Sequence, residues 1–136
     1  MASVRAVLIL LGAISFASST TAAYGQCVVF EKPEELFARS DAIFVATVVT
    51  NEPTGTQGAH EIVSIARLRV ERSWKGRLRR EVRVGSDRPF EVGKKYVVFA
   101  SGKPLSTSIL CGAAEPVDRA KPKLDWLTTK RGRPAG

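Results

Sequence analysis

The chain has 136 residues, of which 44% are hydrophobic, and 21 Lys and Arg against 13 Asp and Glu give it a formal net charge of +8. This length supports one domain with one modest core and excludes a second domain. The positive surface attracts polyanions and acidic proteins non-specifically, and a need for solubility accounts for the same charge.

The first 25 residues have the layout of a cleavable secretory signal. Arg5 and the amino terminus form a short positive region, Ala6 to Ala17 is continuously apolar, and Ser18 to Gly25 is small and mostly polar. The apolar run is well short of the roughly 20 residues that cross a bilayer. We therefore expect a secreted or periplasmic protein with no stable membrane span.

The preferred cleavage site follows Gly25 and leaves Gln26 as the new terminus, with cleavage after Ala23 as the alternative. A lipoprotein signal would modify Cys27, but Gln26 and Tyr24 are not the residue types that such a signal needs. We assign 1–25 to the signal, 26–127 to the folded domain and 128–136 to a basic disordered tail.

The mature chain begins with a short helix and continues with strands. Pro33 to Arg39 has a proline and two acids in its first turn and an arginine at its end, which favours a helix. Ala42 to Thr50 is almost entirely apolar and predicts a strand buried on both faces along part of its length. The remaining predicted strands are His60 to Trp74, which has one wet face, Glu81 to Val84, Lys95 to Ser101 and Leu105 to Cys111.

Helical spacing returns between Ala114 and Leu127, although Pro122 restricts a helix there. The fold class predicted is mainly β: a small five-stranded OB-like barrel with a short helix before the first strand and a helix after the last, with a β-sandwich as the alternative. The predicted core residues are Phe44, Val48, Leu68, Val70, Trp74, Tyr96, Val98 and Phe99.

The mature chain has two cysteines, Cys27 and Cys111, near its opposite ends. Outside the cytoplasm two cysteines usually pair, and a bridge that closes so long a loop would stabilise the fold by about 4.5 kcal/mol in the chain-entropy model. The alternative is a metal pair, which is a poor site because His or carboxylate ligands do not accompany the thiols.

Two blocks of residues form a pattern in a fixed order. The first is Pro33-x-x-x-Phe37-x-x-x-Asp41 ahead of an apolar strand. The second is a strand ending Val70-x-x-x-Trp74-Lys75-Gly76, then Phe90-x-x-Gly93-x-x-Tyr96-Val97-Val98-Phe99-Ala100 and a cysteine about ten residues later. Together the two blocks resemble the tissue inhibitors of metalloproteinases, a netrin-like OB barrel family, and most closely its short bacterial members.

The resemblance implies a secreted protein-binding module whose amino-terminal edge contacts a metallopeptidase. It also matches Cys27 and Cys111 to the family's bridge between the amino terminus and the end of the barrel. No residue matches the family's zinc-chelating first cysteine, and Ala38 replaces another family cysteine. The expected contact segment is Gln26, Cys27, Val28 and Val29, and the expected activity is weak inhibition of a metalloendopeptidase.

Catalytic and metal-binding patterns are missing from the sequence. His60 is the only histidine, so neither a histidine-based triad nor a multi-histidine metal site can form. Phosphate-binding loops, dinucleotide fingerprints and nucleophile elbows are absent too. We expect a protein that is not an enzyme and has no cofactor, no metal and no catalytic residue.

A second functional hypothesis rests on the densest basic stretch of the chain. On a strand and its following turn these side chains could line a groove for acidic polysaccharide or nucleic acid, as barrels of this class use one face for oligomeric ligands. A solvated basic face is the simpler interpretation, because aromatic residues hardly interleave with the arginines. The candidate polyanion-binding residues are Arg67, Arg69, Lys75, Arg77, Arg79 and Arg80.

Overall fold

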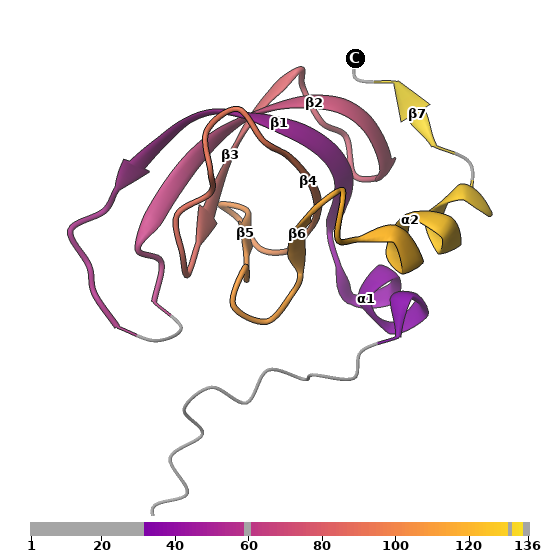
Figure 1. Ribbon diagram of the computed structural model, residues 1–136, viewed down its shortest axis with the longest axis horizontal. Helices are drawn as coiled ribbons and strands as arrows, with labels where there is room; N and C mark the ends of the chain where they lie inside the picture. Colours follow the sequence, from indigo (N-terminus) through magenta and orange to yellow (C-terminus); the bar gives the residue numbers. More distant parts are fainter. Residues whose placement is uncertain (1–31, 59–60, 131, 135–136) are drawn as a thin grey trace, which may run out of the picture.

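The computed structural model describes residues 32–58, 61–130 and 132–134, so the predicted strand start at His60 and the segment before Lys32 lie outside it. Figure 1 shows a strongly curved sheet with two short helices beside one end. In chain order the elements are α1 (Pro33–Arg39), β1 (Ala42–Pro53), β2 (Ser64–Lys75), β3 (Glu81–Ser86), β4 (Lys95–Ala100), β5 (Ser106–Thr107), β6 (Ala114–Pro116), α2 (Lys121–Thr128) and β7 (Arg133–Pro134).

Five strands form a nearly closed ring in the order β1-β2-β3-β5-β4. β1 pairs antiparallel with both β2 and β4, β2 pairs antiparallel with β3, and β3 pairs parallel with β5. An antiparallel bridge between Ser101 and Ser106 joins β5 to the end of β4 and completes the ring. The predicted mainly β, OB-like barrel with a helix before the first strand is confirmed. Two further strands extend it, β6 on β4 and β7 on β2.

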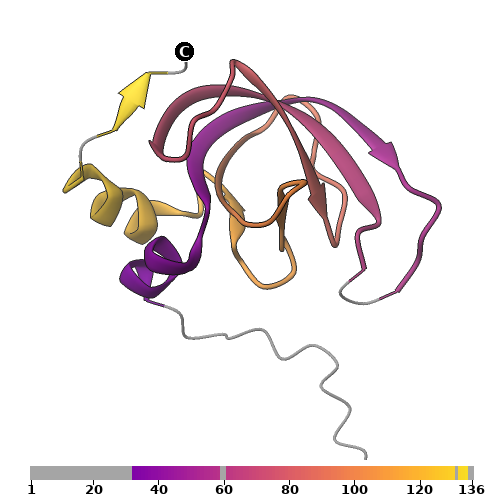
Figure 2. The same ribbon diagram turned by 180° about the vertical axis from the view of Figure 1, so that it is seen from behind.

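β1 is buried on both faces over its first half, as predicted, and this divides the core into two clusters. Phe44 and Val48 point into the barrel, whereas Ile43 and Val45 point outward, under the helices. Figure 2 shows α1 and α2 side by side against this end of the barrel. Of the eight predicted core residues, Trp74 is half-buried and the other seven are buried. The seven buried residues are Phe44, Val48, Leu68, Val70, Tyr96, Val98 and Phe99.

Helix α1 spans the residues predicted for it, with Pro33 at its start and two glutamates in its first turn. Its carboxyl end is held by the barrel. The Lys75 ammonium donates to the Phe37 carbonyl at 2.7 Å and to the Ala38 carbonyl at 3.2 Å. A cation at this end stabilises the helix dipole and satisfies carbonyls that have no partner within the helix.

The carboxy-terminal part of the domain differs from its prediction. Ala114–Pro116 forms a strand against Tyr96–Val98 instead of the start of a helix, and α2 begins only at Lys121. Pro122 explains this start, because a proline in the first helical turn removes no intrahelical hydrogen bond. At the boundary of the expected tail, Thr128 ends α2, and Arg133–Pro134 pairs with β2.

The strand predicted over Leu105 to Cys111 contains only the two residues of β5. After it, the backbone N–H groups of Ile109 and Leu110 donate to the Asp87 carboxylate at 2.9 and 3.2 Å. A side chain thus takes the donors that a longer strand would have used. Neither helix within the described residues has the length and apolarity needed to cross a membrane.

Gly76 allows the β2–β3 turn to pass close to the start of β1. Its φ is +87°, and a Cβ there would lie 3.0 Å from the Asp41 carbonyl oxygen and 3.2 Å from the Ala42 Cβ. Gly93 has nearly the same φ, +86°, but a Cβ there would meet nothing within 4 Å. The two glycines therefore differ in their surroundings rather than in their backbone conformation.

We predict that Gly76→Ala lowers the free energy of unfolding by about 2–4 kcal/mol, because the new methyl group introduces both backbone strain and a steric conflict. Gly93→Ala should cost only about 1 kcal/mol, the backbone component alone. Urea unfolding of both variants measures the difference. Equal losses would contradict the close approach of the turn to β1.

Candidate functional site

The outer face of the barrel carries two arginines directly opposite each other. In the β2–β3 register Arg67 pairs with Arg83, and Thr50 of β1 lies opposite Arg67 on its other side. Both arginines are exposed. Like charges directly opposite on antiparallel strands repel each other. The two guanidinium groups of Arg67 and Arg83, called the arginine row below, therefore favour an anion between them.

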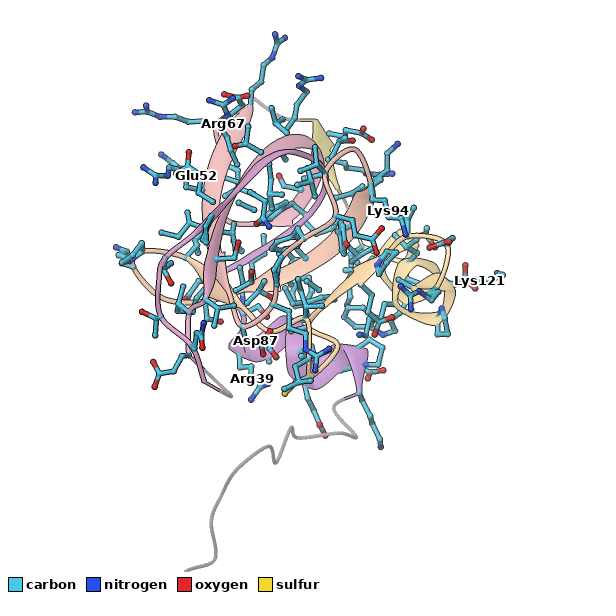
Figure 3. All side chains as sticks on the ribbon, turned by 60° about the vertical axis from the view of Figure 1, so that its left-hand side comes forward. Arg39, Glu52, Arg67, Asp87, Lys94 and Lys121 are labelled. Atoms are coloured by element: carbon cyan, nitrogen blue, oxygen red, sulfur yellow. The ribbon has the colours of Figure 1, made fainter. Side chains whose placement is uncertain are left out.

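These residues line a recess of about 220 Å³ on the outer sheet, together with Glu52 and Ile65. Figure 3 shows Arg67 and Glu52 on the same side of the molecule. Arg67 Nε lies 3.8 Å from the Glu81 carboxylate, and the two side chains are 49% and 47% exposed. An ion pair this long and this exposed stabilises the fold by at most about 1 kcal/mol and leaves the guanidinium available.

Around this row, the β2–β3 hairpin (Ser64–Ser86) concentrates the positive charge of the chain. It contains eight of the Lys and Arg side chains and two glutamates, whereas the whole chain has a formal charge of +8. Five of the arginines are exposed and meet no acidic side chain within 4.0 Å among the described residues. They are Arg69, Arg77, Arg79, Arg80 and Arg83.

Two cations of the hairpin are engaged locally. The Lys75 ammonium caps α1, as described above, so this predicted polyanion-binding residue is turned toward the helix. The Arg72 guanidinium lies 5.2 Å from the centre of the Trp74 ring, a cation–π arrangement. The predicted set thus divides: Arg67 and Arg69 lie on the outer face, Arg77, Arg79 and Arg80 lie in the turn, and Lys75 has a structural role.

The acidic Glu71 on this face is already neutralised by a neighbour. Lys95 Nζ lies 2.8 Å from its carboxylate, and the Thr47 hydroxyl donates to it at 3.1 Å. The hydrogen bond from Lys95 is the largest cause of the lowered pKa of the Glu71 carboxyl. Glu71 therefore stays charged and paired, and it does not offset the unpaired arginines.

A second recess, of about 400 Å³, lies between α1 and the loop after β5. Arg39 and Cys111 both line it, and Figure 3 shows Arg39 and Asp87 close to α1. Asp87 organises this loop, because it accepts hydrogen bonds from the Ser108 hydroxyl and from the Ile109 and Leu110 N–H groups.

Cys111 is held by this loop, and its N–H donates to the Ser108 hydroxyl oxygen at 2.9 Å. No cysteine is free within the described residues. Its predicted partner Cys27 lies outside them, together with Gln26, Val28 and Val29, so the disulfide and the amino-terminal contact segment stay predictions.

Comparison with known proteins adds no family. No protein-family model matches the chain, and no curated protein matches it. Within the described ranges, no group of three His, Cys, Asp or Glu side chains is placed to hold a metal ion. The arrangement can hold anions through guanidinium groups.

Sequence reasoning missed Asp87, which stands in an ordinary loop sequence, Ser-Asp-Arg-Pro. Its role depends on a loop that is distant in the chain and close only in the fold. The opposition of Arg67 and Arg83 was missed for the same reason, since it requires the strand register. Alternation of arginine with apolar residues in both strands is the signal that comes nearest to it.

We predict that Asp87→Ala lowers the free energy of unfolding by about 1–3 kcal/mol, because three donors lose a charged acceptor. Asp125→Ala is the matched control, since Asp125 makes an exposed ion pair with Lys121 at 2.7 Å. Its loss should cost at most about 0.5 kcal/mol. Urea unfolding gives both values, and similar losses would contradict the organising role of Asp87.

Proposed function

We propose that this protein is a non-enzymatic binding protein that holds polyanions on the outer face of its β2–β3 hairpin. The observation that carries the proposal is the placement of Arg67 directly opposite Arg83, with further exposed arginines toward the hairpin turn. A sulfate, phosphate or carboxylate group between two guanidinium groups would replace their repulsion with charge-assisted hydrogen bonds.

The ligand is expected to be a polymer with repeated anionic groups, either acidic polysaccharide or nucleic acid. Arg77, Arg79 and Arg80 extend the positive surface past the end of the strands, beyond the reach of one small anion. Trp74 is the only aromatic residue of the hairpin, and it lies under Arg72 and not on the arginine row. Recognition would therefore act through the charged backbone of the polymer and not through base stacking.

Binding of heparin and of double-stranded DNA as a function of salt tests the proposal. Arg79→Ser combined with Arg80→Ser should weaken binding to both and reduce the slope of log K against log salt by about two units, one for each lost contact. The matched control is Lys94→Ser combined with Lys121→Ser, which removes the same charge from other elements, outside the hairpin. Equal losses in the two double variants would contradict a site on the hairpin and indicate only a net-charge effect.

A second candidate function is the one that the family resemblance implies, inhibition of a secreted metallopeptidase by the amino-terminal edge. It is supported by the placement of Cys111, which the Asp87 loop holds beside α1. A bridge from Cys27 to this position would fix Val28 and Val29 close to the helix. The segment would then bind without the full entropic cost of ordering a loose tail.

A panel of zinc endopeptidases distinguishes the two functions. The second candidate expects weak inhibition that Val28→Asp combined with Val29→Asp abolishes, while the Arg79 and Arg80 double variant inhibits normally. If the protein leaves every peptidase active, this candidate is wrong. The polyanion proposal is unaffected by that result, because it depends on the salt-sensitive binding alone.

A further inference from the structure

A third recess, of about 520 Å³, lies on the outer sheet around Gly85 of β3. Gly85 pairs with Ile65 of β2 on one side and with Ser106 of β5 on the other. Ile62 leans over the glycine, since a Cβ at this position would lie 2.8 Å from the Ile62 side chain. The glycine therefore leaves room for an apolar recess on the outer face. Its aliphatic lining consists of Ile62, Ile65, Pro104 and Leu105.

This apolar recess is continuous with the recess at the arginine row. Arg83 and Ile65 line both of them. Arg83 and Gly85 are two residues apart in β3, and Val84 between them belongs to the interior core, so both lie on the outer face. Positions i and i+2 of a strand are roughly 7 Å apart. One small molecule can therefore reach the arginines and the apolar recess at the same time.

The charges around the apolar recess favour an anion at one of its ends. Arg83 is exposed and meets no acidic side chain within 4.0 Å among the described residues. Glu52 lies opposite Ile65 on the β1 side, and it lines the recess of the arginine row but not the apolar recess. Glu81 is two residues from Arg83, in the direction away from Gly85. Both carboxylates thus lie outside the apolar recess.

We propose that this face binds one molecule of an anionic amphiphile, an aliphatic chain that ends in a sulfate, phosphate or carboxylate group. The anionic group lies between Arg67 and Arg83, and the chain lies along the outer face of β3 in the apolar recess. An apolar cavity with a few charged groups at its rim is the usual form of a small-molecule site. The inference rests on the anion site proposed above and adds a second class of ligand to it.

Two other occupants fit this face less well. The arginines and the apolar recess lie side by side, so the chain must lie flat beside its head group, whereas an intact bilayer keeps its chains behind the head groups. In a second copy, Val92 is the most exposed large aliphatic side chain of the described residues, at 63%. Glu91 beside it is already paired with Lys94 at 2.7 Å, so docking of Val92 would bring a lysine to the arginines.

Titration calorimetry with butyl sulfate and octyl sulfate, each below its micelle-forming concentration, tests the proposal on residues 26–136. Each buried methylene raises affinity by up to about fourfold. We expect octyl sulfate to bind at least about tenfold more tightly than butyl sulfate, because the recess is partly open to water. Octyltrimethylammonium has the same chain length and the opposite charge, and it should not bind.

Variants separate the two parts of the site. Ile62→Ser should lower the octyl-to-butyl affinity ratio at least about threefold and leave heparin binding unchanged, whereas Val92→Ser, at an exposed aliphatic residue elsewhere, should change neither. Arg67→Ser should weaken both sulfates by a similar factor, about threefold to tenfold, and keep their ratio. Lys121→Ser removes the same charge from α2 and should leave both affinities unchanged.

The outcomes distinguish this inference from the proposed function. Heparin binding that depends on Arg79 and Arg80, together with equal affinities for the two sulfates, would overturn the inference and leave the function intact. A chain-length dependence that Ile62→Ser removes, without heparin binding to the hairpin, would do the reverse.

Three further results would overturn the inference. One is binding of the cationic amphiphile as tightly as octyl sulfate, which would mean that the arginines take no part. Another is binding to anionic vesicles without binding of free octyl sulfate, which would identify a membrane surface as the ligand. The third is a dimer in sedimentation that Ile62→Ser dissociates and octyl sulfate does not, which would identify a second copy as the occupant.

Discussion

The structure depends on the burial of β1 on both faces. Its first half pairs with β2 on one side and β4 on the other, and its side chains alternate between the barrel interior and the layer under the helices. A charged side chain at any of these positions would be buried without a partner, at a cost of several kcal/mol. β1 therefore holds the two helices, the barrel and the register of its neighbours in one arrangement. Lys75 adds to this, because it belongs to the strand beside β1 and caps α1.

The same constraint explains where the positive charge can lie. The helices cover only the part of the sheet that contains the first half of β1, so the outer face of β2 and β3 remains in water. Alternation in β2 then directs Leu68 and Val70 inward and Arg67 and Arg69 outward. The register places Arg67 against Arg83, which costs stability unless an anion or the exposed Glu81 carboxylate compensates for it. We interpret this unfavourable pair as a sign of function, since neutral side chains at both positions would fold equally well.

Much of the fold could be predicted from local patterns, and the least predictable parts depend on contacts between distant residues. Pro33–Arg39 and the four longer strands follow from helix-end signals, apolar runs and alternation. The segment Ala114–Pro116 was expected to be helical because its spacing is ambiguous, and pairing with β4 decides the outcome. Within the candidate site, the sequence indicated the basic stretch. It did not show which of these side chains lie on the outer face, which lie in the turn and which contact other elements. That Lys75 faces a helix terminus, and that Arg83 lies opposite Arg67, follows from strand register and packing, which composition does not contain.

Mapping the bound polyanion on the protein tests the central claim most directly. Amide chemical shifts of the ¹⁵N-labelled protein would be followed while a short heparin fragment is added at physiological salt. The account predicts that shift changes concentrate on the outward residues of the hairpin and its turn, at Arg67, Arg69, Arg83 and between Arg77 and Arg80. Changes of similar size at α1, α2 and the hairpin would contradict it, because they would mean that the ligand responds to total charge and not to the arginine row.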